Sequence, residues 1–452
     1  MTNMDHPKTN AARASSRRRF LRQSAAAMAG TAVVGVLPGV AQTAGERPLK
    51  LALVGCGDRG TGAVAQALST AGPIKLWAMA DLFPDRVDSS LALLTKGEQA
   101  AYDREAHAGF SDRVDVPLER RFVGFDAYKG AIESGADLVI LATPPHFRPM
   151  HFAYAVERGK HLFMEKPLAV DAPGIRQVMA ANAEAKKKNL KIGVGLMFRH
   201  SPCRIETVRR VREGAIGKIT FMRCYWNMGS LRDTAPRPAD QTEMNYQLRN
   251  PYHFVWLNGD YIVDALPHFL DLCLWVKGEH PVSAQGQGGR QFYTSGQSGD
   301  GFDHHSIEYT FADGVKLFAQ TRQIPHCWNS SSAHVHGNGG SADLDRGVIL
   351  GTAPWRFKGA ASNPYQVEWD ALVEAVRKEQ SYNEVDYATM TTMTAILGRM
   401  ASYSGKVLEW DEALNATIRL APDKYALDAQ PPVVADASGR YPVAMPGLTQ
   451  VL

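Results

Sequence analysis

A glycine-rich loop directly after a short apolar run is where we expect the chemistry of this chain to be organised. The run Leu51–Val54 is followed by G-C-G-D-R-G (residues 55–60), and a helix-compatible stretch begins at Ala63. G-x-G-x-x-G set between a strand and a helix is the fingerprint of a dinucleotide-binding loop. Gly55 permits the tight turn, Gly57 lets a diphosphate approach the backbone, and Gly60 lets the helix pack close to the strand.

An acidic residue lies at the distance from this loop that the fingerprint requires. Asp81 ends a second apolar run, Ile74–Ala80, about 20 residues after the glycines. A carboxylate there accepts hydrogen bonds from a ribose 2′-hydroxyl and repels a 2′-phosphate, which favours NAD over NADP. Arg86 lies close by and keeps NADP possible. Asp58 and Arg59 open the helix whose N-terminus would meet the phosphates. The alternative is a structural turn and a solvated aspartate.

Two further strand ends carry polar residues that could reach the same ligand. The run 136–143 ends in Thr143-Pro144-Pro145-His146, and 161–164 ends in Glu165-Lys166-Pro167. Ligands of parallel sheets bind beyond the carboxyl ends of the strands, so we assign Thr143, Pro144, His146, Glu165 and Lys166 to the cofactor site. The Lys166 ammonium could hold a substrate hydroxyl and its developing negative charge as hydride leaves. The alternative is a surface lysine before a proline that starts a helix.

A third motif pairs a carboxylate with an imidazole. Asp264 and His268 are four residues apart, which places both on one face if a single helix contains them. A carboxylate beside an imidazole makes a general acid or base that titrates near neutrality. Asp271 follows one turn later. The alternative is a capped helix with a half-buried structural histidine.

The elements that must position these residues predict an α/β fold with two domains. Up to about residue 195 apolar runs alternate with helical stretches, which is typical of a doubly wound parallel sheet. After residue 219 the pattern favours a mostly antiparallel, open-faced sheet, with strands expected at 219–226, 282–288, 306–311 and 315–323. Two late helices, 365–378 and 387–404, precede an irregular tail. We divide the chain into a signal segment (1–45), a Rossmann domain (46–168), an α+β domain (169–415) and the tail (416–452).

These motifs, in this order and approximate spacing, resemble those of the Gfo/Idh/MocA oxidoreductases, the relatives of glucose-fructose oxidoreductase and inositol dehydrogenase. The resemblance extends over about 48–415 and includes Tyr403-Ser404-Gly405-Lys406. It implies that Lys166 and His268 form the catalytic pair, that Asp264 orients or assists them, and that the substrate lies between the nicotinamide and the open sheet. The sequence departs from the family pattern before Asp264, where Asn258-Gly259-Asp260-Tyr261 replaces a glycine-rich turn.

Several polar and aromatic residues are candidates for binding a sugar. Aromatic faces pack on the C–H surfaces of sugars, while histidines bond their hydroxyls. The candidates are Arg199, His200, Tyr252, Trp256, His326 and Trp328. The histidines near residues 304 and 326–336 have no standard zinc spacing, so we predict no metal site.

The N-terminus has the pattern of an export signal. Residues 17–19 are Arg-Arg-Arg, followed by Phe-Leu, a mildly apolar run to Val40, and small residues. This resembles a twin-arginine signal and predicts a periplasmic or otherwise exported protein without a permanent membrane span. The alternative is a disordered basic tail.

The first 45 residues carry six basic residues and one acidic residue, Asp5, which gives them a net charge of +5. The rest of the chain therefore carries about −1 of the total charge of +4. The body of the chain therefore shows no nucleic-acid footprint. The five scattered cysteines predict neither a disulfide framework nor a metal site.

The function we expect is hydride transfer between NAD, or NADP, and a carbinol carbon of a carbohydrate or polyol. Because an exported enzyme meets no pool of free NAD(H), the cofactor is expected to stay bound and be recycled. A second hypothesis is an NAD-dependent, redox-neutral glycosidase, which oxidises, eliminates, adds water and reduces. A third, of another class, is a non-catalytic sugar-binding protein. A broad open sheet also predicts a homo-oligomer, either a dimer or a tetramer.

Overall fold

The first sheet of the computed structural model, sheet A, has six parallel strands in the order β3-β2-β1-β4-β5-β6. The structure describes residues 47–97, 109–229, 237–238, 240–295 and 298–452, so the expected signal segment lies outside the described residues. The strands of sheet A are β1 (Leu49–Val54), β2 (Ile74–Asp81), β3 (Arg121–Val123), β4 (Leu138–Leu141), β5 (His161–Met164) and β6 (Ile192–Val194). This order is that of the dinucleotide-binding fold.

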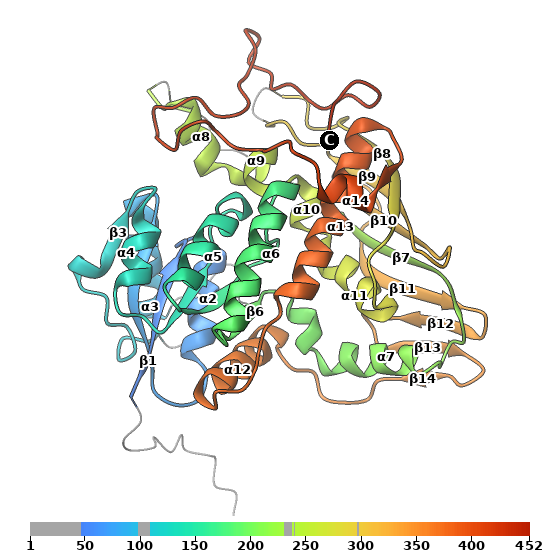
Figure 1. Cartoon of the computed structure of the whole chain (residues 1–452), viewed down its shortest axis with the longest axis horizontal. Coiled ribbons are helices and arrows are strands. Elements are labelled where there is room, and N and C mark those ends of the chain that lie inside the picture. The colour runs from blue at the N-terminus through green and yellow to red at the C-terminus, as the bar shows by residue number, and fades with distance from the viewer. Residues whose placement is uncertain (1–46, 98–108, 230–236, 239, 296–297) are drawn as a thin grey trace, which may run out of the picture. The chain divides into compact units, whose positions relative to one another are not determined.

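Helices cover both faces of sheet A (Figure 1). Side chains of α2 (Asp58–Leu68), α3 (Pro84–Lys96) and the late α12 (Pro364–Arg377) share one core with the sheet. Side chains of α4 (Ala127–Glu133), α5 (Arg148–Glu157) and α6 (Ala172–Lys187) share the other. All four residues of β4 are buried, as expected for a strand covered on both faces. The predicted parallel, doubly wound sheet is confirmed.

The Rossmann sheet extends beyond residue 168, where the sequence placed its boundary. Strand β6 pairs in parallel with β5, and α6 packs beside α5. Helix α12 returns to this domain from much later in the chain, and its Trp369 ring lies 4.4 Å from Phe163 of β5. The first domain is therefore assembled from two separate segments of the chain.

The second sheet, sheet B, has nine strands in the order β14-β13-β12-β11-β7-β10-β9-β8-β15. Only the pair β10 and β7 is parallel, so the predicted mostly antiparallel sheet is confirmed. The strands are β7 (Ile219–Met228), β8 (Ser283–Gly289), β9 (His304–Thr310), β10 (Lys316–Gln323), β11 (Ser330–Gly337), β12 (Gly340–Asp343), β13 (Val348–Gly351), β14 (Trp355–Arg356) and β15 (Leu408–Glu409). Strands β11–β15 were not predicted from the sequence.

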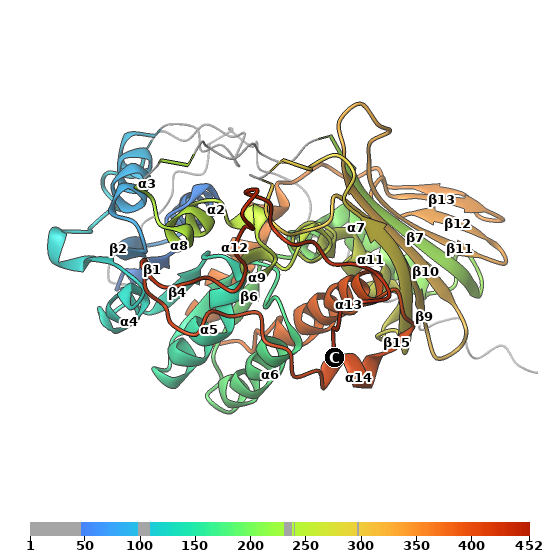
Figure 2. The same cartoon turned by 90° about the horizontal axis from the view of Figure 1, so that it is seen from above.

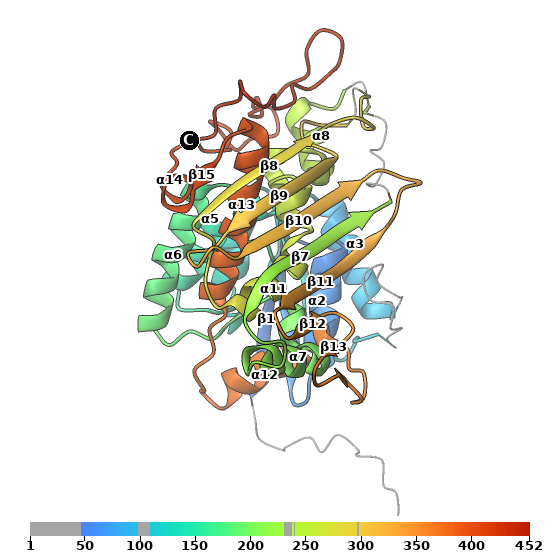
Figure 3. The ribbon, with the colours of Figure 1, turned by 90° about the vertical axis from the view of Figure 1, so that its right-hand side faces the viewer.

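One face of sheet B packs on helices, and the other is open in the described part of the chain (Figures 2 and 3). Strand β10 alternates buried and more exposed residues, the period expected of a half-covered strand. Its inward residues share a core with α7 (Pro202–Arg212), α11 (Pro267–Lys277) and the long α13 (Val385–Ser404). Helix α13 ends at Gly405, whose φ of +69° is a left-handed cap.

A connection between β7 and α11 brings part of the second domain back to sheet A. It contains α8 (Glu243–Arg249), η4 (Pro251–His253), α9 (Val255–Asn258) and α10 (Tyr261–Asp264). Phe254 and Trp256 of this connection share an apolar cluster with Phe83 and Phe147 of the first domain. After α14 (Trp410–Leu414) the tail has no helix or strand, and its Tyr425 and Tyr441 pack on the same cluster. No helix in the described residues has both the length and the apolar character needed to cross a membrane.

Candidate active site

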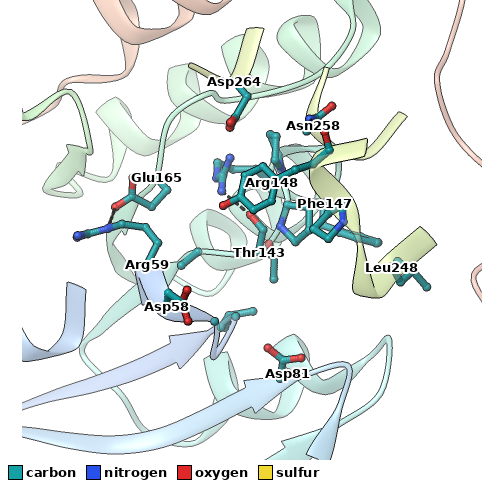
Figure 4. A pocket seen from close by; sticks show the side chains of 18 of the residues that line it. Asp58, Arg59, Asp81, Thr143, Phe147, Arg148, Glu165, Leu248, Asn258 and Asp264 are labelled. Atoms are coloured by element: carbon teal, nitrogen blue, oxygen red, sulfur yellow. Dashed lines mark hydrogen bonds and ion pairs between the residues drawn. The ribbon is translucent and has the colours of Figure 1, made fainter. Parts of the chain in front are cut away.

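A cavity of about 630 Å³ lies where the strand ends of sheet A meet residues 248–268 of the second domain. The loops after β1, β2, β4 and β5 line one side, and η4, α9, α10 and the start of α11 line the other. Figure 4 shows Asp81 and Asp264 at opposite ends of this view, with Thr143 and Arg148 between them. The crevice therefore lies where a doubly wound sheet binds its ligands.

The glycine loop has the geometry of a diphosphate cradle. Gly55 has a φ of +100°, and a Cβ there would lie 2.5 Å from the Thr143 nitrogen. A Cβ on Gly60 would lie 2.0 Å from the Gly55 carbonyl oxygen, so Gly60 is needed for helix α2 to pack against β1. A Cβ on Gly57 would meet only an Arg86 nitrogen, at 3.9 Å. Gly55 and Gly57 line the cavity, and Gly60 supports them from beneath.

The N-terminus of α2 points its first turn at this space. Gly57 is the N-cap and offers no side-chain acceptor, and Asp58 and Arg59, in the first turn, line the cavity. A helix N-terminus without a side-chain cap leaves N–H groups and a partial positive charge for an anion. The residues present therefore fit the diphosphate of a dinucleotide.

Asp81 fixes the other side of the loop. Its Oδ2 accepts a hydrogen bond from the Cys56 N–H at 2.7 Å, and its Oδ1 accepts one from the Phe83 N–H at 3.0 Å. Burial raises the pKa of Asp81, and these two bonds and Arg86 oppose the rise. Asp81 and Arg86 both line the cavity, as the sequence predicted. Arg249, which also lines it, is engaged by Asp85 in a two-pronged ion pair at 3.0 Å.

Thr143 and Pro144 line the cavity, but His146 does not. The His146 ring bonds the Tyr425 hydroxyl at 2.8 Å and lies edge-on to Trp256, 5.0 Å away. Burial lowers the pKa of His146 to about 3, so the ring is neutral. His146 therefore contacts the tail and helix α9, and its assignment to the cofactor site stays a prediction.

Glu165 and Arg59 form an ion pair at the wall of the cavity. Arg59 Nε lies 2.6 Å from Glu165 Oε1, and Arg59 Nη2 donates to Gln66 Oε1 at 2.8 Å. Tyr365 of α12 stacks on the Arg59 guanidinium, 5.0 Å from the ring centre. Because both charges are largely buried, each needs the other to remain in place.

Lys166 reaches across the cavity to the second domain. Its Nζ donates a hydrogen bond to the backbone carbonyl of Asp264 at 2.6 Å and lies 3.7 Å from the Asp264 carboxylate. The Lys166–Pro167 peptide is cis. Lys166, Asp264 and His268 all line the same cavity, so the structure brings the three predicted catalytic residues together.

Asp264 and His268 do not share one helix, which corrects the sequence prediction. Helix α10 ends at Asp264 and α11 begins at Pro267, with Ala265 and Leu266 between them. Pro267 cannot donate the N–H that a continuous helix would need, so a new helix begins there. No hydrogen bond or ion pair links the Asp264 carboxylate to the His268 ring in the described structure.

His268 is a buried, neutral imidazole. It is 8% exposed, and its Nδ1 has no hydrogen-bond partner. Burial, together with the positive charges of Lys166, Arg204 and Arg59, lowers the pKa of His268 well below its usual value. The His268 ring lines the cavity, while its Nδ1 is a buried ring nitrogen without a partner.

Of the predicted substrate residues, only Tyr252 lines this cavity. Arg199 is held by Asp271 in two bonds of 2.8 and 2.9 Å, and His200 bonds Glu384 at 2.9 Å. Trp256 is buried, with its N–H donating to Gln247. The hydrogen-bonding groups of these three side chains therefore already have partners within the protein.

The remaining two predicted substrate residues lie in a turn between two strands of sheet B and are not among the residues that line the cavity. His326 lies in the turn between β10 and β11, with a φ of +60°. Trp328, in the same turn, is 62% exposed and lies edge-on to Tyr225. Within the described residues no group of three or more histidines, cysteines or acidic residues could hold a metal ion.

Several cavity residues were not predicted as site residues. They are Arg148, His151, Trp226, His253, Asn258, Tyr261, Gln323 and Tyr365. Asn258 and Tyr261 belong to the stretch that departs from the family pattern, and this departure could have marked them as site residues from the sequence. Gln323 and Tyr365 come from β10 and α12, so only the tertiary structure brings them here.

Comparison with known proteins supports this geometry. Residues 99–196 match the model of an "Oxidoreductase family, NAD-binding Rossmann fold", and residues 206–343 match the Gfo/Idh/MocA C-terminal domain. Together the two matches span more than half of the chain. The glycine loop itself precedes the first matched segment.

Similar proteins share parts of this chain. The scyllo-inositol 2-dehydrogenase (NAD⁺) of Bacillus subtilis is 28% identical over 36% of this chain and 42% of its own length. Glycosyl hydrolase family 109 protein 1 of Bacteroides fragilis is 23% identical over 40% of this chain and 37% of its own length. This chain therefore aligns with less than half of either relative.

The fold is shared with solved structures. Aldose-aldose oxidoreductase from Caulobacter crescentus, complexed with glycerol, superposes with a TM-score of 0.59 at 18% identity, covering 80% of this chain and all of that chain. The two matched domains, the sheet order and the converging lysine and histidine agree with one another. The chain belongs to the Gfo/Idh/MocA family of oxidoreductases.

Proposed function

We propose that this protein is an NAD-dependent oxidoreductase that transfers hydride to or from a carbinol carbon of a carbohydrate or polyol. The observation that carries the proposal is that Lys166 and His268 line one cavity with the glycine loop and Asp81. A crevice that only bound sugar would not need a cradle for a diphosphate next to a proton-handling pair.

We propose the residues that would hold NAD from their positions along the cavity. Gly55, Gly57 and the N-terminus of α2 suit the diphosphate, Asp81 suits the adenosine ribose, and Thr143 and Glu165 lie farther along the cavity. The carboxylate of Asp81 disfavours a 2′-phosphate, so NAD is the preferred cofactor. Arg86 beside it is the feature that would serve NADP.

Lys166 and His268 have complementary roles toward a hydroxyl group. When bound, NAD supplies the hydride acceptor. The neutral His268 imidazole can accept the hydroxyl proton as the carbon is oxidised. The Lys166 ammonium, anchored on the Asp264 carbonyl, can donate to the same oxygen and stabilise its negative charge. In the reducing direction the proton moves back along the same path.

The substrate class is inferred from relatives and from the cavity wall. One relative is named for an inositol, and the residues that line this cavity include the aromatic Trp226 and Tyr252 and the amide of Gln323. Aromatic faces and amides together suit a polyhydroxylated ring.

A second candidate is the redox-neutral glycosidase. It is favoured by the family 109 glycosyl hydrolase relative, which matches 40% of this chain. In such a reaction the glycoside is oxidised, loses its aglycone by elimination, takes up water and is reduced again. The same pair of residues would serve both reactions, so only the product distinguishes them.

We also propose that the protein is exported and homo-oligomeric. Support for export is the arginine-rich N-terminal segment, and retained cofactor would suit a compartment without free NAD(H). Fusing residues 1–45 to a reporter, with Arg17 and Arg18 replaced by lysine as control, tests export.

Support for self-association is the open face of sheet B, where Phe221, Phe318 and Leu350 are 37–59% exposed. Light scattering of wild type and Phe318→Arg tests it.

The deciding experiment follows the NADH absorbance band of purified protein supplied with NAD⁺ and a panel of scyllo-inositol, glucose and a nitrophenyl glucoside. Persistent absorbance supports the dehydrogenase, whereas released nitrophenol with no net NADH supports the glycosidase. The matched control is Lys166→Met. Tight sugar binding without either product, in a protein that also fails to bind NAD, would overturn both enzymatic proposals in favour of a sugar-binding protein.

A further inference from the structure

Arg148 is a buried cation in the wall of the cavity that makes no ion pair within the described residues. It is the first residue of α5 and is only 1% exposed. Figure 4 shows it between Thr143 and Asp264. The carboxylates of Glu165 and Asp264 attract this charge without pairing with it directly. Burying a charge without a direct partner is costly, so the hydrogen bonds of the guanidinium matter.

The hydrogen bonds of Arg148 go to two backbone carbonyls. Its Nη2 donates to the carbonyl of Thr143 at 2.5 Å, and its Nη1 donates to the carbonyl of Pro167. Its buried Nε has no partner. Burial lowers the pKa of Arg148 to about 10, which still leaves the group charged at neutral pH.

These two carbonyls belong to the two loops that form the reactive end of the site. Thr143 follows β4, and Pro167 directly follows Lys166 after β5. Strands β4 and β5 are neighbours in sheet A. One rigid, planar group therefore joins the loop beside the glycine cradle to the loop that carries the lysine.

We propose that Arg148 is a positioning residue for Lys166: it fixes the carbonyls of Thr143 and Pro167 relative to each other and so holds the Lys166 ammonium at the cavity. The catalytic meaning of this placement rests on the proposed function. The placement itself is a property of the chain and can be measured without turnover.

The fork geometry explains why an arginine stands here. A guanidinium presents donors on separate nitrogens in a fixed plane, so one side chain reaches both carbonyls. A lysine ammonium is a point charge that would reach one carbonyl well and the other poorly, and a methionine would reach neither. The series Arg148→Lys and Arg148→Met therefore removes the bridge in two steps.

The test compares these two variants with the wild type and with Arg158→Met. Arg158 caps the other end of α5, where it is partly exposed and pairs with Glu133 and Glu157, so it controls for loss of an arginine from the same helix. The turnover assay uses NAD⁺ and the panel sugar that the wild type converts fastest. A second readout is acetylation of Lys166 at one pH, quantified by mass spectrometry against the exposed Lys187.

For Arg148→Met we expect kcat to fall about 100-fold, the loss typical of a catalytic group displaced by about 1 Å. The NAD dissociation constant should change by less than about threefold, because the glycine loop and Asp81 are untouched. Acetylation of Lys166 should change severalfold while that of Lys187 does not. The kcat of Arg148→Lys should lie between those of the wild type and Arg148→Met, and Arg158→Met should have the kcat of the wild type.

Unchanged kcat and unchanged Lys166 acetylation in folded Arg148→Met would overturn the proposal. So would weaker NAD binding with kcat intact, since Arg148 would then serve the cofactor. If Arg148→Met does not fold, a wild-type kcat in Arg148→Lys would overturn it, because the two-carbonyl bridge would be dispensable. A wild type without turnover would remove the proposed function, while the acetylation series would still decide the role of Arg148.

Discussion

The Lys166 ammonium donates to the main-chain carbonyl of Asp264 at 2.6 Å, while the carboxylate of the same residue is 3.7 Å away. Lys166 follows the last buried residues of β5, and Asp264 ends α10, so this bond joins the two domains across the cavity. Because the nearer acceptor is backbone, no substitution of the Asp264 side chain removes it directly.

This relationship predicts unequal effects at the two positions. Lys166→Met should lower kcat by about 10²- to 10³-fold, the usual range for a lost donor to a developing negative oxygen. Asp264→Asn should cost less than about tenfold, because the carbonyl contact remains. Steady-state kinetics and NAD titration measure both. Lys160→Met is the control, since Lys160 precedes the same strand, lies outside the cavity lining and donates to the Ala136 carbonyl. Equal losses at 166 and 264 would show that the carboxylate is the working group.

Two glycines of the loop have different roles: Gly57 is expected to matter for NAD binding, and Gly60 for the stability of the fold. Gly57→Ala should fold normally, because a Cβ there meets only Arg86 at 3.9 Å, but it should weaken NAD binding at least tenfold by filling the diphosphate cradle. Gly60→Ala should destabilise the protein by several kcal/mol, because its Cβ would lie 2.0 Å from the Gly55 carbonyl. Thermal unfolding and NAD titration distinguish them. Tight NAD binding by Gly57→Ala would mean that the diphosphate lies elsewhere.

Asp81 should determine cofactor choice. Asp81→Asn removes the negative charge while an amide oxygen can still accept one of the two backbone N–H bonds. With Arg86 beside it, the ratio of NADP to NAD affinity should rise at least tenfold, about 1.4 kcal/mol. Fluorescence titration with both nucleotides measures this. Asp88→Asn is the control, because Asp88 is an exposed carboxylate on α3 that does not line the cavity. An unchanged ratio would place the ribose away from Asp81.

Buried imidazoles should make the protein sensitive to acid. Burial lowers the pKa of His151 from 6.5 to about 3, and it does the same for His146. The unfolded chain therefore binds protons that the folded chain excludes, so stability falls as pH drops below about 6.5 and continues to fall toward pH 3. At pH 5 each buried imidazole should lower the free energy of unfolding by about 2 kcal/mol relative to pH 8.

His151→Gln should remove about 2 kcal/mol of that pH dependence. Urea unfolding at about pH 8 and pH 5 measures it, and His280→Gln, at an exposed position, serves as the control. If His151→Gln lost as much stability between about pH 8 and pH 5 as the wild type does, the acid sensitivity would come from other groups.

The glycine loop, Asp81 and the strand-end lysine were readable from the sequence because their signals are local. A strand run, a turn that needs glycine and a helix that follows are encoded within about thirty neighbouring residues. The alternation of strands and helices in the first domain and the late helices α12 and α13 were predicted from similar periodic patterns, whereas the order of strands in sheet A came from the structure. The pairing of Lys166 with His268 came from the family resemblance.

The tertiary structure decided which polar side chains are available to a ligand. Arg199, His200 and Trp256 have the chemistry of sugar-binding residues, but Asp271, Glu384 and Gln247 already satisfy them. Arg148 is the reverse, a residue without a sequence signal whose position depends on two carbonyls from neighbouring strands. Composition and spacing determine which groups the chain carries. Whether a group bonds the protein or faces the cavity depends on contacts between residues far apart in sequence, and no local pattern encodes them.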